Sequence, residues 1–302
     1  MVKNLVLENI SVGFKLPQGV FYAVDDVSLN LPGGNFTAII GESGCGKSVL
    51  GQAILNILPS GVVKKGSVLY NGEQVKKILS AFGIIPQNPS ESLNPVRKIG
   101  KQMQDILAVH NIVDSSNSYK KQCLRLFGLQ EAERVLAAYP HELSGGMLQR
   151  VLCAMAVSSK PEWILADEPT KGLDEQVGAV VRKNLLTIKQ DLHLSMLIIT
   201  HDIALAQEVC DDVLVMYAGQ VLEHNADIWH KPLHPYTKGF LQALPKNGLQ
   251  VIPGKAPVPG ESFTGCKFAA RCPYCTERCK EEKPAMQQVG NAEVRCFLYA
   301  EG

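Results

Sequence analysis

The length, composition and charge of this chain exclude several classes of protein. Its 302 residues suffice for one large α/β domain with a smaller appendage. Hydrophobic residues make up 46% and charged residues 20%, as in ordinary globular proteins. The 30 basic side chains are balanced by 29 acidic ones, which gives a formal net charge of +1. Because nucleic-acid binders usually carry a basic excess, we expect no nucleic-acid partner.

No segment of the sequence is suited to span or cross a membrane. No apolar run approaches the roughly 20 residues needed to span a bilayer. The first ten residues contain Lys3 and Glu8 and lack the continuous apolar stretch of a secretory signal. We therefore expect the chain to remain in the cytoplasm.

The first part of the chain changes from strand patterns to helix patterns. Apolar and polar residues alternate over the first 31 positions, which predicts strands of a half-buried sheet. Residues 36–40 form a short apolar run that leads directly into a glycine-rich loop. From about Ser90 to Ser158 the spacing becomes helical, as Met103, Ile106 and Leu107 illustrate.

The second part of the chain predicts parallel strands and then a loop-rich tail. Residues 163–166 and 196–199 are apolar runs that each end at a polar residue, as buried parallel strands do. Residues 181–190 between them predict a crossover helix. From about Lys231 onward, prolines interrupt any long element; they are Pro232, Pro235, Pro245, Pro253, Pro257, Pro259, Pro273 and Pro284.

A phosphate-binding loop is predicted where the first buried strand ends. Residues 41–48 fit the pattern G-x-x-x-x-G-K-S/T between a strand and a helix that starts near Val49. The glycines allow backbone N–H groups to point at phosphates, and the helix N-terminus adds partial positive charge. Lys47 is expected to reach the β- and γ-phosphates, and Ser48 to bind Mg²⁺. The residues expected to bind ATP here are Gly41, Glu42, Ser43, Gly44, Cys45, Gly46, Lys47, Ser48 and Val49.

Two adjacent carboxylates follow the apolar run at 163–166. Asp167 is suited to hold Mg²⁺, and Glu168 to polarise a water molecule aligned with the γ-phosphate. Taken alone, such a pair could equally be a solvated turn. Together with the phosphate-binding loop, it predicts a nucleotide-hydrolysing site.

A third motif resembles the signature of one ATPase family. Residues 143–150, Leu-Ser-Gly-Gly-Met-Leu-Gln-Arg, resemble the signature motif of ABC ATPases. Ser144 suits a helix N-cap, and the two following glycines leave N–H groups accessible to a phosphate. In that family the motif faces the γ-phosphate held by the other ATPase subunit. The resemblance therefore implies that Ser144, Gly145, Gly146 and Gln149 act in trans.

Further residues take their expected roles only from this resemblance. Gln87 resembles the Q-loop glutamine, which contacts Mg²⁺ and links the nucleotide to the transmembrane partner. Asp174 resembles the D-loop aspartate at the dimer interface, and His201 the switch histidine that touches the γ-phosphate. Phe14 stands where the family has an aromatic residue stacked on adenine, and Tyr22 is the alternative.

The resemblance covers nearly the whole chain and implies its fold. It predicts an α/β P-loop ATPase domain of the ABC type over residues 1–230, with a mixed sheet and a helical subdomain at about 90–158. The segments 233–245, 252–254 and 265–273 resemble the carboxyl-terminal extension of the oligopeptide, dipeptide and nickel importer ATPases. Residues 231–302 are therefore expected to be a small, loop-rich extension.

Five of the nine cysteines lie in this extension. On their chemistry alone, four thiolates in a proline-rich loop suit an iron–sulfur cluster and tetrahedral zinc equally well. The resemblance favours a 4Fe–4S cluster, with Zn²⁺ as the alternative and Cys275 as a possible substitute ligand. The expected ligands are Cys266, Cys272, Cys279 and Cys296.

The resemblance also implies a function and a set of partners. We expect the chain to bind and hydrolyse Mg-ATP and to power import of di- or oligopeptides from the cytoplasmic face of the membrane, as a peripheral subunit. Two permease subunits, a second ABC ATPase in a heterodimer or homodimer, and an extracytoplasmic binding protein would complete the importer. The alternatives are a nickel-chelate importer, a soluble ABC ATPase without a transport role, and a sensing role for the cysteine tail.

Overall fold

The computed structural model describes residues 3–17, 19–74, 81–244, 248–258, 261 and 263–300, so that Pro245 and Pro259 of the expected tail fall outside it. The chain forms two compact units. Unit 1 takes in the described residues of Met1–Lys3, Pro32–Phe36 and Lys76–Val209; unit 2 takes in those of Asn4–Leu31, Thr37–Val75 and Cys210–Gly302. None of the helices in the described ranges is both long and apolar enough to span a bilayer.

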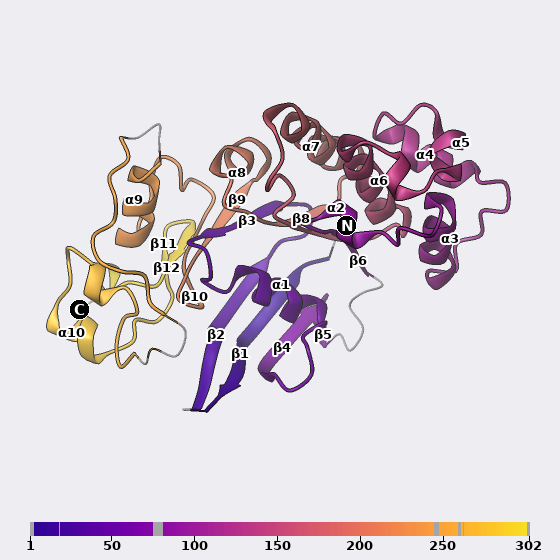
Figure 1. Cartoon of the computed structure of the whole chain (residues 1–302). Coiled ribbons are helices and arrows are strands. Elements are labelled where there is room, and N and C mark those ends of the chain that lie inside the picture. Colours follow the sequence, from indigo (N-terminus) through magenta and orange to yellow (C-terminus); the bar gives the residue numbers. More distant parts are fainter. Residues whose placement is uncertain are drawn as a thin grey trace. The chain divides into compact units, whose positions relative to one another are not determined.

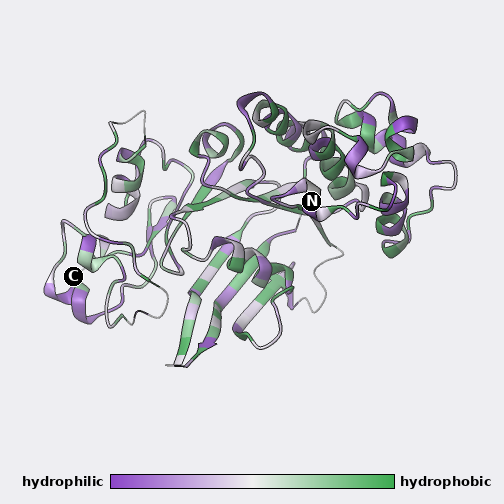
Figure 2. Ribbon diagram, viewed as in Figure 1, coloured by the Kyte–Doolittle hydropathy of each residue, from purple (hydrophilic) through white to green (hydrophobic). Residues whose placement is uncertain are grey.

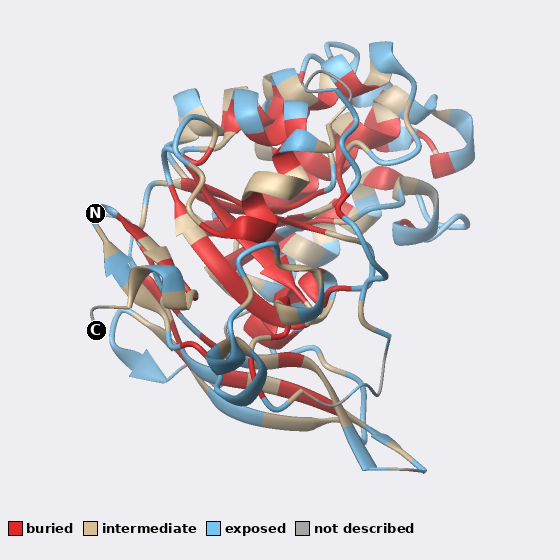
Figure 3. Cartoon of the chain, turned by 90° about the vertical axis from the view of Figure 1, so that its left-hand side faces the viewer, coloured by how far each residue is buried: buried red, intermediate tan, exposed pale blue. Residues whose placement is uncertain are grey.

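Unit 1 contains a parallel sheet whose strands end at one edge. Its strands are β6 (Phe82–Ile85), β7 (Trp163–Asp167) and β8 (Ser195–Ile199), paired in that order. Ile85 is paired with Ala166 and Asp167 with Ile199, which brings the three carboxyl ends level. Strands β7 and β8 are buried along almost their whole length (Figure 3), which explains why they form continuous apolar runs in the sequence.

The region for which the sequence predicts helices is helical. Three buried residues on one face of α3, Ile99, Met103 and Leu107, follow the spacing of an amphipathic helix. The helices of this region are α2 (Pro89–Ser92), α3 (Ile99–Val109), α4 (Ser118–Leu126), α5 (Ala132–Ala137) and α6 (Gly145–Ser158) (Figure 1).

The crossover helix between β7 and β8 starts earlier than the sequence suggests. Helix α7 spans Glu175–Thr187 and continues as a π-helical turn over Ile188–Leu192. It begins at Glu175 because the Asp174 carboxylate caps it, accepting a hydrogen bond from the Val177 N–H at 2.9 Å. After β8 the chain forms α8 (Ile203–Val209).

Unit 2 contains an antiparallel sheet built from the alternating pattern near the start of the chain. Leu5 and Leu7 of its strand β1 are buried, whereas Glu8 and Asn9 are exposed. Strand β1 pairs with both β2 and β4. The order of the strands is β2 (Gly19–Leu31), β1 (Leu5–Leu16), β4 (Val63–Tyr70) and β5 (Glu73–Gln74).

Three further strands of unit 2 present the phosphate-binding loop. Strand β3 (Phe36–Gly41) is fully buried and runs parallel to β9 (Asp212–Tyr217), with Gly41 opposite Met216. The chain leaves β3 through a turn and enters α1 (Lys47–Leu55). Strand β9 continues antiparallel to β10 (Gln220–Asn225).

The carboxyl-terminal segment is built from short elements joined by long connections. Helix α10 is hydrophilic (Figure 2) and none of its residues is buried. The His234 side chain caps α9, and its burial lowers its pKa to about 3, so the imidazole stays neutral and accepts the Tyr236 N–H. The elements are α9 (Pro235–Gln242), a 3₁₀ turn (Ala269–Arg271), α10 (Glu277–Glu281), β11 (Gln287–Val289), β12 (Ala292–Val294) and a second 3₁₀ turn (Phe297–Tyr299).

Two glycines allow the turn after β3 to approach its neighbours closely. A Cβ atom on Gly41 would lie 2.2 Å from the Met216 carbonyl oxygen, and one on Gly46 would lie 2.1 Å from that of Ala23. Both glycines have positive φ, 150° and 105°. Gly44 also has a positive φ, 77°, but open space surrounds the position of its Cβ. Sterics therefore require glycine at positions 41 and 46, whereas position 44 requires only the left-handed conformation.

We predict that Gly46→Ala lowers the free energy of unfolding by at least about 2 kcal/mol, since the methyl group can be accommodated only by moving the Ala23 backbone. The control Gly44→Ala should lower the free energy of unfolding by only about 1 kcal/mol, which is the strain of placing alanine in the left-handed conformation. Urea unfolding of the two variants and the unaltered chain measures both effects. Equal decreases in the free energy of unfolding would show that the close contact at Gly46 does not affect stability.

A histidine joins the core of unit 2 to its carboxyl-terminal hairpin. His224 on β10 lies with Nε2 3.1 Å from Asp212 Oδ2 and Nδ1 3.2 Å from Glu293 Oε2 on β12. Burial by itself lowers the pKa of His224, but hydrogen bonds and charges from Asp212 and then Glu293 outweigh it and raise that pKa above the usual value. Protonation of the imidazole therefore strengthens the attachment of the hairpin.

We predict that the stability gained from His224 depends on pH. Because its pKa is raised in the folded chain, the contribution is complete below the unfolded-state pKa of about 6.5 and disappears as the pH rises through the folded-state value. A tenfold gain in proton affinity on folding corresponds to about 1.4 kcal/mol of stability. Urea unfolding of the unaltered chain and His224→Gln, from about pH 5.5 to about pH 8.5, measures this difference. A difference that stays constant with pH would contradict it.

Candidate functional site

The loop after β3 has the local geometry of an anion-binding site. Helix α1 begins at Lys47, and Gly46 at its N-cap accepts the Leu50 N–H at 2.9 Å. Ser43, Gly44 and Ser48 are exposed, whereas Cys45 and Gly46 are buried. The N–H groups of the first helical turn have no partner within the helix, so they can bind a phosphate oxygen there.

The Lys47 ammonium is held against its own loop. Its Nζ donates to the carbonyl oxygens of Gly41 at 2.9 Å and Glu42 at 3.0 Å, and it contacts Cys45 Sγ at 3.9 Å. The residue is 7% exposed. These partners are neutral, so a phosphate oxygen can replace them with a stronger, charge-assisted hydrogen bond.

The two aromatic candidates for stacking on adenine lie in different places. Tyr22, together with Ala23, Gly44 and Gly219, lines a cavity of about 420 Å³ beside the loop. Phe14 lies on β1 opposite Phe21 and is not part of that lining. Both side chains are half-buried. Geometry within unit 2 therefore places Tyr22, rather than Phe14, at the cavity next to the loop.

In unit 1, the carboxyl ends of the parallel strands bring a carboxylate and an imidazole together. Glu168 follows β7, and its Oε2 lies 2.7 Å from His201 Nδ1 and 3.3 Å from the His201 backbone N–H. Glu168 is 9% exposed and has a positive φ of 48°, a conformation that is costly for a residue with a side chain. Its N–H donates to the Ile199 carbonyl at 2.8 Å, which holds it there.

Gln87 and Asp167 share this edge of the unit 1 sheet. Asp167 is the last residue of β7 and is half-buried. Gln87 follows β6 and is exposed. The parallel register of β6, β7 and β8 therefore gathers Gln87, Asp167, Glu168 and His201 at one side of unit 1.

The residues of the signature motif differ in how accessible they are. Ser144 caps α6, accepting the Met147 N–H at 3.3 Å, and both Ser144 and Gly145 are exposed. Open space surrounds the positions that Cβ atoms on Gly145 and Gly146 would take. The Gln149 side chain is only 1% exposed, and neither its amide oxygen nor its amide nitrogen has a hydrogen-bond partner among the described residues. The accessible part of the motif is thus its helix start, and the role in trans of Gln149 stays a prediction.

Asp174 is exposed and acts as the N-cap of α7, as described above. One carboxylate oxygen of Asp174 accepts the Val177 N–H at the start of the helix, and the other oxygen is available to a partner. A structural role and an interface role are therefore compatible at this residue.

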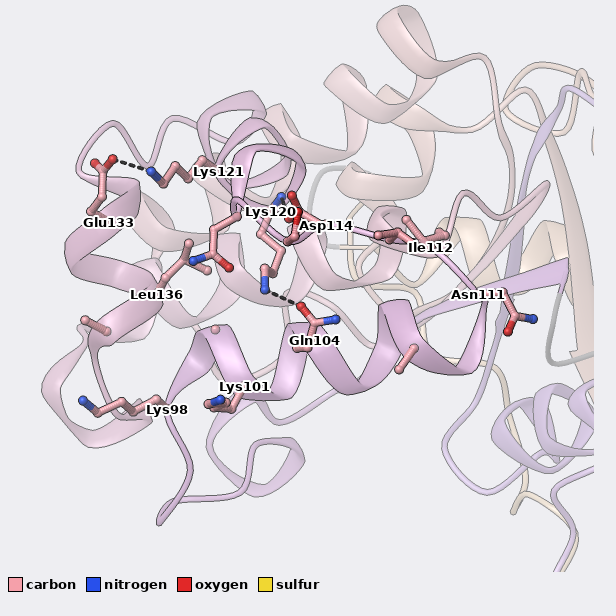
Figure 4. Close-up of a pocket in the computed structure, with 16 residues that line it drawn as sticks. Lys98, Lys101, Gln104, Asn111, Ile112, Asp114, Lys120, Lys121, Glu133 and Leu136 are labelled. Carbon is pink, nitrogen blue, oxygen red and sulfur yellow. Dashed lines mark hydrogen bonds and ion pairs between the residues drawn. The ribbon is translucent and has the colours of Figure 1, made fainter.

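The helical part of unit 1 contains a cleft that no motif in the sequence indicates. It has a volume of about 900 Å³ and is lined by α3, α4 and α5 (Figure 4). Lys120 is 3% exposed, donates to Gln104 Oε1 at 2.6 Å and has a pKa lowered mainly by burial, while Lys121 pairs with Glu133 at 2.6 Å. The sequence shows the pair of lysines, but it gives no sign that one of them is buried.

The cysteines of the carboxyl-terminal segment converge on one cavity in unit 2. The cavity has a volume of about 180 Å³ and is lined by Cys266, Cys272, Cys279 and Cys296, whereas Cys275 is not part of its lining. All four are free cysteines, and burial raises the pKa of Cys266 to about 11. Within the described residues, no three His, Cys, Asp or Glu side chains lie close enough together to hold one metal ion.

Two family descriptions match the sequence. Residues 24–171 match the family "ABC transporter", and residues 222–279 match "Oligopeptide/dipeptide transporter, C-terminal region". Among curated proteins, the oligopeptide transport ATP-binding protein OppD of Haemophilus influenzae is 35% identical over 98% of each chain. The dipeptide transport ATP-binding protein DppD of Escherichia coli is 36% identical over 95% of this chain and 94% of that protein.

A solved structure shares the fold of the nucleotide-binding part. The dimeric structure of MJ0796, a bacterial ABC transporter cassette, has a TM-score of 0.60 and is 26% identical, covering 72% of this chain and 96% of that one. The expected fold, a P-loop ATPase of the ABC type that acts on ATP with Mg²⁺, is thereby confirmed. With full-length relatives at this level of identity, the chain belongs to the family of ABC transporter ATPases that contains the oligopeptide and dipeptide transport ATP-binding proteins.

Proposed function

We propose that this ABC ATPase powers the import of di- or oligopeptides across the cytoplasmic membrane. The observation that carries the proposal is the match of the carboxyl-terminal segment to the oligopeptide/dipeptide transporter region, in a chain whose full-length relatives are named for those substrates. No relative described above is named for nickel, so the peptide substrate is preferred. The full-length relatives described above are named as transport proteins, which favours a transport subunit over a soluble ABC ATPase.

The residues of unit 2 bind the nucleotide. Lys47 moves from the carbonyls of Gly41 and Glu42 to the β- and γ-phosphates, and the N–H groups at the start of α1 bind phosphate oxygens. Tyr22 stacks on the adenine ring; its position in the cavity beside Gly44 supports it over Phe14. Ser48 would be a ligand of Mg²⁺, and so would Asp167 and Gln87 of unit 1; the ion would neutralise charge on the β- and γ-phosphates.

The residues at the strand ends of unit 1 carry out hydrolysis. The Glu168 carboxylate accepts a hydrogen bond from the water molecule that attacks the γ-phosphorus, which breaks the bond to ADP and releases phosphate. The 2.7 Å contact to His201 orients this carboxylate, and the left-handed backbone at Glu168 fixes where it points. His201 is well exposed, with 58% of its side chain accessible, so it can also reach a γ-phosphate.

The partners are those of an importer motor. The exposed start of α6, with Ser144, Gly145 and Gly146, completes the nucleotide site of a second ATPase subunit in a heterodimer or homodimer, and Asp174 lies at that interface. A groove of about 420 Å³ beside Gln87, lined by Ile84, Pro86 and residues of α3 and α6, receives one of two permease subunits. Residues 1–230 act as the ATPase domain, with 90–158 as its helical subdomain.

The subunit works on the cytoplasmic face of the membrane as a peripheral protein. Substrate reaches the permeases from an extracytoplasmic binding protein, so this chain does not contact the peptide. The substrate is therefore selected elsewhere, and the ATPase supplies only the free energy of hydrolysis.

The carboxyl-terminal extension, residues 231–302, holds a 4Fe–4S cluster through Cys266, Cys272, Cys279 and Cys296. The four thiols line one cavity, which supports their sharing one metal group, and the resemblance of this segment to the importer extension favours a cluster over one zinc ion. When bound, such a cluster supplies four metal–thiolate bonds that tie together a segment with few buried side chains. Its role is structural, since no part of the described extension contains a long helix or strand that could fold alone.

We predict that Glu168→Gln binds ATP normally but loses nearly all ATP hydrolysis, by roughly a hundredfold or more, because the amide cannot polarise the attacking water. Equilibrium binding of a fluorescent ATP analogue and phosphate release measure the two properties on the same sample. The matched control Lys47→Ala should lose binding as well. Undiminished hydrolysis in Glu168→Gln would refute the role given to this carboxylate.

We predict that the chain purified without oxygen is brown, absorbs broadly near ~400 nm and contains about four irons per chain. Cys272→Ser, which removes a thiol from the cavity, should lose the colour, whereas Cys275→Ser should keep it. Iron and zinc analysis of the three samples provides the measurement. A colourless protein with one zinc ion per chain would overturn the cluster assignment.

A further inference from the structure

The phosphate loop is held from outside by two residues of the carboxyl-terminal segment. Arg271 Nη1 lies 3.1 Å from Oε1 and 3.2 Å from Oε2 of Glu42, the second residue of the loop. The Tyr236 hydroxyl accepts a hydrogen bond from the Glu42 backbone N–H at 3.2 Å. Glu42 is therefore fixed through both its side chain and its main chain. All these residues belong to unit 2.

Arg271 is itself held rigidly. Its Nε donates to the Pro253 carbonyl at 3.1 Å, and Nη1 also lies 3.3 Å from the Tyr217 hydroxyl. The guanidinium lies 5.7 Å from the ring centre of Tyr217 and 6.0 Å from that of Phe268. Its side chain is only 8% exposed. An arginine fixed in this way loses little conformational entropy on pairing with a carboxylate, so the contact with Glu42 is stronger than a surface ion pair.

An aromatic cluster connects the turn that carries Arg271 to the loop. The Phe268 ring packs edge-on against Tyr217 and Tyr236, with ring centres 5.4 Å apart in both pairs. The three residues are at most 1% exposed. Tyr217 is the last residue of β9, the neighbour of β3, and Tyr236 contacts Glu42 directly. Displacement of the turn would therefore disturb the residues that hold the loop.

A second cation of the same turn supports the other side of the loop. Lys267 Nζ lies 2.8 Å from Asp25 Oδ2 and donates to the Ala218 carbonyl at 2.8 Å. The next residue, Gly219, donates its N–H to the Cys45 carbonyl of the phosphate loop at 2.9 Å. Lys267 follows Cys266, and Arg271 precedes Cys272. The two cations that support the loop are thus chain neighbours of two cysteines that line the cavity.

We infer that Arg271 is a positioning residue for ATP binding, which holds Glu42 and with it the phosphate loop in the conformation that accepts a triphosphate. The inference rests on the proposed function, because the loop must bind ATP for its position to matter. Arg271 also neutralises the Glu42 carboxylate, which would otherwise repel the triphosphate. The packing of the cysteine-bearing turn therefore sets the affinity of the loop for nucleotide.

Two effects of Arg271 can be separated by changing Glu42 as well. Arg271→Ala removes the anchor and leaves an unpaired negative charge in the loop, so ATP binding should weaken by about tenfold or more. Glu42→Gln removes the charge and should weaken binding less. The double variant should bind ATP more tightly than Arg271→Ala alone, because the repulsive carboxylate is gone. If Arg271 acted only in general folding, the additional change of Glu42 would not restore ATP binding.

The test uses the full chain, purified without oxygen, and measures equilibrium binding of a fluorescent ATP analogue. Arg271→Lys, which keeps the charge but loses the Nε–H bond to the Pro253 carbonyl, should fall between the unaltered chain and Arg271→Ala. Lys280→Ala is the matched control, since it removes an exposed cation of the same segment that pairs with Glu277 rather than with the phosphate loop. Unfolding midpoints and metal content measured on each sample show whether the turn remains folded.

Affinities of Arg271→Ala within about twofold of the unaltered chain would overturn the inference. The inference would also be overturned if the losses of ATP affinity in Arg271→Ala and Glu42→Gln simply multiplied in the double variant. A loss of affinity that follows the unfolding midpoint or the metal content would overturn it as well. Failure of the unaltered chain to bind the analogue would instead overturn the proposed function, and the inference with it.

Discussion

Everything proposed for this chain depends on a tight backbone turn between a buried strand and a helix. Gly41 and Gly46 bring that turn against the carbonyl oxygens of Met216 and Ala23, at distances that exclude any side chain. The turn directs Lys47 back onto its own loop, with its ammonium on two neutral carbonyls. A site built in this way is ready for a strongly negative ligand, because exchanging weak acceptors for phosphate oxygens requires no large rearrangement of the backbone.

The catalytic carboxylate that we propose depends on a different physical device. Glu168 adopts a left-handed conformation that only glycine adopts readily, and the Ile199 carbonyl and the His201 imidazole hold it there. Strain of this kind is retained where it fixes a functional group. In the phosphate loop of unit 2, the positive φ angles belong to glycines. In unit 1 the positive φ belongs to Glu168, because the proposed chemistry requires its carboxylate.

Short-range patterns were enough to predict much of this protein. The phosphate loop, the Asp167–Glu168 pair and the signature helix could be recognised because each lies within about eight consecutive residues, and the apolar runs before them indicated the strands. The ABC-type α/β fold was implied by the family resemblance that these motifs carry. The start of α7 was misplaced because the cap at Asp174 outweighs the polar residues that follow it.

What the sequence could not reveal are contacts between distant positions and the direction of side chains. Gln149 belongs to a surface motif by its position, yet its side chain is buried. The sequence left Phe14 and Tyr22 as alternatives, and only the lining of the cavity beside the loop separates them. The pair formed by Glu42 and Arg271 spans 229 positions, so neither residue carries a local sign of the other.

That separation also governs when the loop can be completed as the chain is synthesised. The ribosome makes the chain from its amino terminus, so Glu42 emerges long before Arg271 and Tyr236 exist. Contacts between residues so far apart in sequence form late and slowly. The newly made ATPase therefore carries a phosphate loop without these outer supports until Tyr236 and Arg271 have been added. A chain released before them would contain every motif of the catalytic domain without the contacts that hold its phosphate loop.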